Sequence, residues 1–114
     1  MKIAVASESG ADGGGIGHFG RCMEFVVFEV REEKILGREV VKNPFYDNHV
    51  PGEVPKFLIS QNVDILITRA AGQNAIKMLE SASIRVVFAQ GEVRDAVDRY
   101  LEGKLPEASN VCSH

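Results

Sequence analysis

Val63-Asp-Ile-Leu-Ile-Thr68 is a short, mostly apolar run, and it begins the part of the sequence in which strand-like and helix-like patterns alternate. Ala75–Ala82 follows with apolar residues on one helical face, and Ile84–Ala89 is typical of another buried strand. Val93–Leu101 repeats apolar residues at helical spacing, and Gly103 stands where a C-terminal cap belongs. Buried strands alternating with helices predict a parallel sheet covered on both faces.

Three further strands and a helix are predicted before this alternation, and two of these strands form a hairpin. Lys2–Ser7 is a short apolar run suited to a buried strand. Phe25–Val30 and Ile35–Val41 are rich in β-formers and flank the charged connection Arg31–Lys34, a pattern that predicts a β-hairpin. A helix is expected to begin near Glu53–Pro55, because proline is tolerated in the first turn, and to run to Asn62, which suits a left-handed C-terminal cap.

The predicted element order is therefore β-β-β-α-β-α-β-α. The hairpin makes the second strand antiparallel, and right-handed crossovers favour a mixed five-stranded sheet of order 3-2-1-4-5. We expect a three-layer α/β/α domain over residues 1–105, followed by a short polar tail over residues 106–114.

Composition narrows the class of protein. The chain has 114 residues, 45% hydrophobic and 25% charged, which excludes a disordered chain and suits one domain. A formal net charge of −3 and a pI near 5.6 disfavour a nucleic-acid partner. No apolar run approaches the about 20 residues of a membrane span, and no secretory signal is visible, so we expect a cytoplasmic protein. Two distant cysteines make no disulfide framework.

In the predicted topology four strands end at the same edge of the sheet, where ligands of open α/β sheets bind. The connections gathered there are Glu8–Cys22, Lys42–Gly52, Arg69–Gly72 and Gln90–Gly91. Six of the eleven glycines fall between Gly10 and Gly20, so the first connection is predicted to be a long irregular loop. Helix N-termini near Gly72 and Gly91 add partial positive charge. The sequence thus predicts an anion site at this edge.

The soft metal ligands of the chain concentrate on these connections and on the tail. His18, Cys22 and His49 fall in or beside the connections, whereas Cys112 and His114 lie in the tail, which is long enough to fold back onto the edge. Thiolate and imidazole suit iron–sulfur centres, copper(I) and zinc. The alternatives are that Cys22 is a small buried apolar residue, that His49 is merely solvated, and that the tail lies away from the site.

Several motifs occur in the order typical of one known family. They are Met1-Lys-Ile-Ala-Val-Ala-Ser7, His18-Phe-Gly-Arg21, Asn43-Pro44, Val63-Asp-Ile-Leu-Ile67, Gly72-Gln-Asn-Ala75 and Tyr100-Leu-Glu-Gly-Lys-Leu105. By these motifs the sequence resembles the dinitrogenase iron–molybdenum cofactor biosynthesis family over about residues 1–105. The resemblance implies a nitrogenase accessory factor-like domain with a ribonuclease-H-like motif.

The same resemblance implies a non-enzymatic role in binding, carrying or delivering an iron–sulfur or iron–molybdenum-type cluster or its precursor. The His-Phe-Gly-Arg motif assigns cofactor binding to His18, Phe19, Gly20 and Arg21, and the helix N-terminus adds Gly72. The chain departs from the family pattern at two places. Phe45-Tyr-Asp-Asn-His49 replaces a stretch that is often rich in glycine and histidine, and Gly72-Gln73 replaces a common Gly-Pro.

Two other functions are alternatives to the carrier. A magnesium-dependent nuclease needs clustered carboxylates, but the strand Lys2–Ser7 carries none and Asp64 sits at the wrong end of its strand. A metal-independent protein-interaction or regulatory module is the stronger alternative, because the strand Ile35–Val41 offers a sheet edge that Arg38 and Glu39 protect only in part. The expected partners are a metal cluster and a donor or acceptor protein, with the chain a monomer or weak homodimer.

Overall fold

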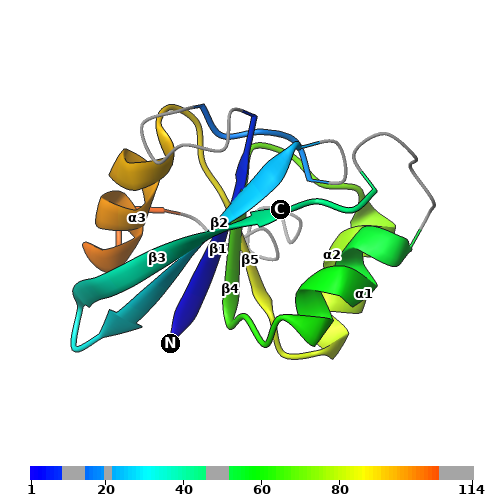
Figure 1. The fold of residues 1–114 in the computed structure, drawn as a ribbon, viewed down its shortest axis with the longest axis horizontal. Coiled ribbons are helices and arrows are strands. Elements are labelled where there is room, and N and C mark those ends of the chain that lie inside the picture. The colour runs from blue at the N-terminus through cyan, green and yellow to red at the C-terminus, as the bar shows by residue number, and fades with distance from the viewer. Residues whose placement is uncertain (9–14, 20–21, 46–51, 106–114) are drawn as a thin grey trace.

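The computed structural model describes residues 1–8, 15–19, 22–45 and 52–105 (Figure 1). Its elements follow the predicted order. They are β1 (Lys2–Ser7), β2 (Glu24–Arg31), β3 (Lys34–Lys42), α1 (Glu53–Ser60), β4 (Ile65–Thr68), α2 (Gln73–Ser81), β5 (Arg85–Phe88) and α3 (Val93–Leu101). Within the described ranges no helix is long and apolar enough to cross a membrane.

The five strands form one mixed sheet of order β3-β2-β1-β4-β5, so the predicted order is confirmed. β2 is antiparallel to both β1 and β3, whereas β4 is parallel to β1 and β5. The carboxyl ends of β1, β3, β4 and β5 therefore lie at a single edge, here called the carboxyl edge. Figure 1 shows α3 on one face of the sheet and α1 with α2 on the other, which gives three layers.

β1 is the central strand, and its alternation divides the core into two apolar clusters. Ile3 and Val5 pack with α3, whereas Ala4 and Ala6 pack with α1 and α2. All four side chains are fully buried, which explains why the strand reads as a continuous apolar run rather than an alternating one.

The helix termini show where the predicted boundaries were inexact. α1 ends at Ser60, two residues before the predicted end, because Asn62 adopts the left-handed conformation with φ 58°. Asn62 is thus the left-handed C-terminal cap that the sequence predicts, and the helical turns end two residues before it. α2 begins at Gln73 instead of Ala75. Gly103 is left-handed with φ 74° after α3, as predicted for a cap.

Two glutamates form the turn of the β2–β3 hairpin. Glu32 and Glu33 have φ angles of 53° and 65°, both in the left-handed region that glycine and asparagine prefer. This turn lies at the end of the sheet opposite the carboxyl edge, because β3 starts there and ends at the carboxyl edge.

Candidate functional site

Residues 15–19, here called the edge segment, cross the carboxyl ends of β1 and β4. The Gly17 N–H donates to the carbonyl of Ala6 at 2.9 Å. The Gly17 carbonyl accepts from the Arg69 N–H at 3.1 Å and from Thr68 Oγ1 at 3.0 Å. The segment is therefore fixed on two neighbouring strands at once.

Ile16 anchors the edge segment on its other side. Its side chain is 3% exposed and belongs to the α3-side cluster, and its N–H donates to the carbonyl of Gly91 at 3.0 Å. Gly15 also bridges to Glu92, the N-cap of α3. The glycine-rich connection was predicted to be a long irregular loop, yet residues 15–19 are held in place, because one apolar residue among the glycines is drawn into the core.

Close packing explains the glycine at position 17. A Cβ placed there would lie 2.9 Å from Cγ of Glu8 and 3.3 Å from Cβ of Cys22. Gly17 therefore separates an exposed acidic side chain from a buried cysteine. Glu8 is not among the site residues predicted from the sequence, where its only signal is its place directly after β1.

His18 lies exposed at the carboxyl edge, where it forms an isolated bridge with Ala70. The next residue strengthens this pairing, because the Phe19 N–H donates to the Ala70 carbonyl at 2.9 Å. Ala70 is two residues before Gly72, the exposed N-cap of α2, which makes no side-chain capping hydrogen bond. The first N–H groups of a helix lack intrahelical acceptors and carry partial positive charge. An imidazole and an anion-attracting helix end thus share one part of the edge.

Cys22 is 1% exposed and lies in the apolar cluster on the side of α1 and α2. The ring of Phe25 in the same cluster is 6.0 Å from that of Phe19 and 6.3 Å from that of Phe57. This environment is the one expected for a small buried apolar residue, the alternative raised from the sequence. A ligand role for Cys22 stays a prediction.

Asn43 joins the end of β3 to the entry of β2. Its side chain is 4% exposed, and its Nδ2 donates to the Cys22 carbonyl at 2.9 Å. Its Oδ1 accepts from the Phe45 N–H at 3.0 Å, and its own N–H donates to the Met23 carbonyl at 3.0 Å. The sequence indicates Asn43 only as the end of a strand and part of a family motif. Its positioning of Cys22 depends on a contact that composition does not reveal.

The remaining candidate residues lie outside the described residues: Gly20, Arg21, His49, Cys112 and His114. Among the residues that are described, no three histidine, cysteine, aspartate or glutamate side chains gather in a way that could hold a metal ion. The described part of the edge therefore supplies an exposed imidazole, a helix N-terminus and a rigid backbone, but not a complete metal centre.

The fold and this edge define an α/β/α domain of the kind that places ligands beyond its strand ends. The family model described as dinitrogenase iron-molybdenum cofactor matches residues 1–103, so the chain belongs to that family. This match confirms the resemblance drawn from the motifs. It places the chain in a family whose description refers to a metal cluster, the iron-molybdenum cofactor.

Three relatives illustrate this membership. The apo form of the orange protein from Desulfovibrio gigas is 29% identical, with a TM-score of 0.84 over 95% of this chain and 92% of that one. A Thermotoga protein with the provisional designation NifB is 30% identical, with a TM-score of 0.78 over 93% and 91% of the two chains. An uncharacterised protein of Methanocaldococcus jannaschii is 29% identical over 91 residues, 77% of each chain.

Proposed function

We propose that this chain is a non-enzymatic carrier that binds an iron–sulfur or iron–molybdenum-type cluster, or a precursor of one, at the carboxyl edge. The observation that carries the proposal is the pairing of His18 with Ala70, which holds an exposed imidazole beside the start of α2. Family membership and the orange-protein relative support a cluster as the cargo.

The backbone around His18 suits it to coordination. Hydrogen bonds from Gly17 and Phe19 fix the chain on both sides of the residue, so the imidazole needs little reordering on binding a metal. A cluster carries negative charge, which the uncapped N-terminus of α2 at Gly72 would attract. Few protein ligands leave a cluster exchangeable, as a carrier requires.

Cys22 enters the proposal as the second ligand, and His49, Cys112 and His114 as optional further ones. Arg21 and Arg69 would pair with the negative charge of the cargo. A purely structural cysteine would be buried in the same way, so the ligand role of Cys22 has to be tested by Cys22→Ser.

The test is anaerobic reconstitution with ferrous iron and sulfide, with and without molybdate, followed by metal analysis and visible absorption. Wild type is compared with His18→Ala, His49→Ala, Cys22→Ser and a chain truncated after Leu105. We expect uptake by wild type and its loss in His18→Ala. Uptake lost only on truncation would move the site to the tail, and no uptake by any chain would refute the carrier.

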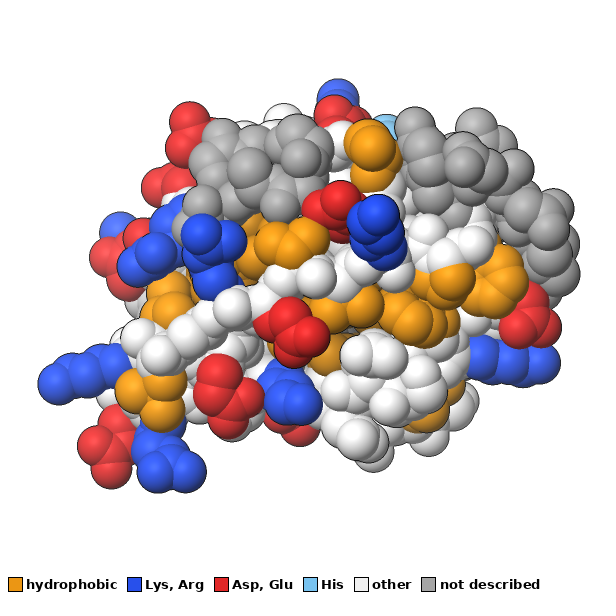
Figure 2. All heavy atoms as spheres, in the orientation of Figure 1, with side chains coloured by type: hydrophobic (Ala, Val, Ile, Leu, Met, Phe, Trp, Pro, Cys, Tyr) orange, Lys and Arg blue, Asp and Glu red, His pale blue; other side chains and the backbone are white. Residues whose placement is uncertain are grey.

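A second candidate function is a metal-independent interaction module, which the exposure of β3 favours. Among the described strands β3 pairs only with β2, and the side chains of Leu36 and Val40 are 61% and 39% exposed. Figure 2 shows charged side chains of both signs mixed with hydrophobic ones over this hairpin. Dimerisation or partner binding by metal-free protein, abolished by Val40→Lys, would support this function over the carrier.

A further inference from the structure

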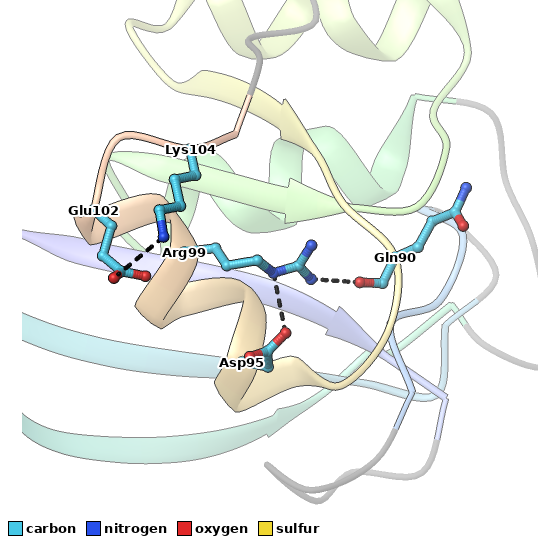
Figure 3. Close-up of polar contacts among 5 residues, drawn as sticks. All are labelled: Gln90, Asp95, Arg99, Glu102 and Lys104. Atoms are coloured by element: carbon cyan, nitrogen blue, oxygen red, sulfur yellow. Dashed lines mark hydrogen bonds and ion pairs between the residues drawn. The ribbon is translucent and has the colours of Figure 1, made fainter.

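Arg99 in the last turn of α3 reaches back to the connection that precedes the helix (Figure 3). One terminal guanidinium nitrogen donates to the backbone carbonyl of Gln90 at 2.5 Å. Nε lies 3.0 Å from Oδ2 of Asp95, within ion-pair distance but not aligned for a hydrogen bond. Arg99 thus connects the helix to the chain between β5 and α3.

The residue after Gln90 carries the contact to the edge segment. Gly91 has φ 99°, a conformation that side-chain-bearing residues rarely adopt, and its carbonyl accepts from the Ile16 N–H. A Cβ on Gly91 would lie 3.6 Å from the same terminal nitrogen of Arg99. Arg99 therefore fixes the carbonyl immediately before the one that holds Ile16.

The Gly91 anchor differs from the other anchors of the edge segment. The Gly17 N–H is held by the end of β1, and Phe19 is held by the chain that directly follows β4. Gly91 instead lies in a connection whose preceding carbonyl is held by a long side chain. The hydrogen bond of the Ile16 N–H, two residues before His18, thus depends on a side-chain contact, in addition to the burial of the Ile16 side chain in the core.

We propose that Arg99 is a positioning residue for the candidate site: by fixing the 90–91 connection it holds Ile16 and so sets where His18 lies. This inference rests on the proposed function for its binding consequence. Its structural part stands on the hydrogen bonds alone.

Arg94 provides a matched control on the same helix. Its Nε lies 3.8 Å from Oδ1 of Asp98, and its side chain is 50% exposed. Arg94→Met therefore removes an arginine and an ion pair from α3 without touching the connection. Arg99→Met removes the guanidinium but keeps most of the apolar stem, whereas Arg99→Lys keeps one charged donor without the planar fork.

The first measurement is amide hydrogen exchange by NMR on the metal-free full chain. We expect Arg99→Met to speed exchange of the Ile16 N–H about tenfold, the effect of losing one charge-assisted hydrogen bond. The Gly17 N–H should exchange faster by a smaller factor, because Ala6 still holds it. Arg99→Lys should restore part of the protection, and Arg94→Met should behave as wild type. Equal Ile16 exchange in Arg99→Met and Arg94→Met would overturn the inference.

The second measurement is the affinity for iron after reconstitution with ferrous iron and sulfide. We expect Arg99→Met to bind iron more weakly than Arg94→Met, by up to about tenfold, the lower end of the loss caused by removing a group bonded directly to a metal ligand, because Arg99 acts on His18 only through the edge segment. Faster Ile16 exchange with wild-type affinity would overturn the positioning role. A wild type that takes up no iron would refute the proposed function, while the exchange rates would still decide whether Arg99 fixes the segment.

Discussion

The side-chain amide of Asn43 donates to the backbone carbonyl of Cys22 at 2.9 Å, inside the protein. Through this bond the end of β3 fixes the chain that enters β2, next to the edge segment. The other end of the amide accepts from Phe45, so both polar ends of the side chain are used. A candidate ligand is thus held by a residue with no metal-binding chemistry of its own.

Replacing Asn43 by alanine should destabilise the fold by about 1–3 kcal/mol, because it removes a buried hydrogen bond to the Cys22 carbonyl and a partly buried one from the Phe45 N–H. The measurement is the free energy of unfolding from denaturant titration. Asn74→Ala is the control, since Asn74 is exposed on α2 and its loss should change stability by less than about 0.5 kcal/mol. Equal effects of the two variants would contradict the structural role of Asn43.

Replacing Gly17 by alanine should cost about 1–3 kcal/mol, because the added Cβ would meet Glu8 and Cys22 at distances that force them apart. Gly37→Ala on β3 is the matched control, since a Cβ there meets nothing within 4 Å. The measurement is the midpoint of thermal unfolding of the two variants, compared with wild type. If Gly17→Ala proved as stable as Gly37→Ala, the close approach of the edge segment to Cys22 would be wrong.

Replacing Glu32-Glu33 by Asn-Gly should stabilise the protein by on the order of 1–2 kcal/mol, because both positions are left-handed. Metal uptake should not change, since the turn lies opposite the carboxyl edge. Denaturant unfolding together with iron analysis tests both statements. An unchanged unfolding midpoint would show that the glutamates are not strained in this turn.

Gln73→Pro, which creates the Gly-Pro common in the family, should raise stability by about 0.4–1 kcal/mol. Gln73 is the first residue of α2, where proline is tolerated, and Gly72 before it is already extended with ψ 155°. Lys77→Pro in the middle of the same helix should instead cost about 3 kcal/mol or more. A loss of stability in Gln73→Pro would contradict the described start of α2.

The sequence predicted the fold well because its signals are local. Alternating strand and helix patterns, with one hairpin, leave few sheet orders open, and the predicted order is the observed one. Helix boundaries were less exact: the left-handed cap at Asn62 is where it was predicted, but α2 begins two residues before the predicted Ala75. The same topology also predicted that four strands end at one edge of the sheet, the carboxyl edge.

The details of the edge could not be predicted in the same way. Ile16 looked like part of a glycine-rich loop, and only the packed structure shows that it enters the core. Asn43 and Arg99 act through hydrogen bonds to backbone carbonyls 21 and 9 residues away in the sequence. Residue type alone does not indicate such partners. The ligand role of His18 stays a prediction that the geometry supports.

The most direct test is pulsed EPR of reconstituted, one-electron-reduced protein labelled with ¹⁵N-histidine. The account predicts a hyperfine coupling between the cluster and a histidine nitrogen that His18→Ala abolishes and that Arg94→Met retains. A reconstituted cluster whose nitrogen coupling survives in His18→Ala would contradict the central claim that His18 binds the cargo at the carboxyl edge.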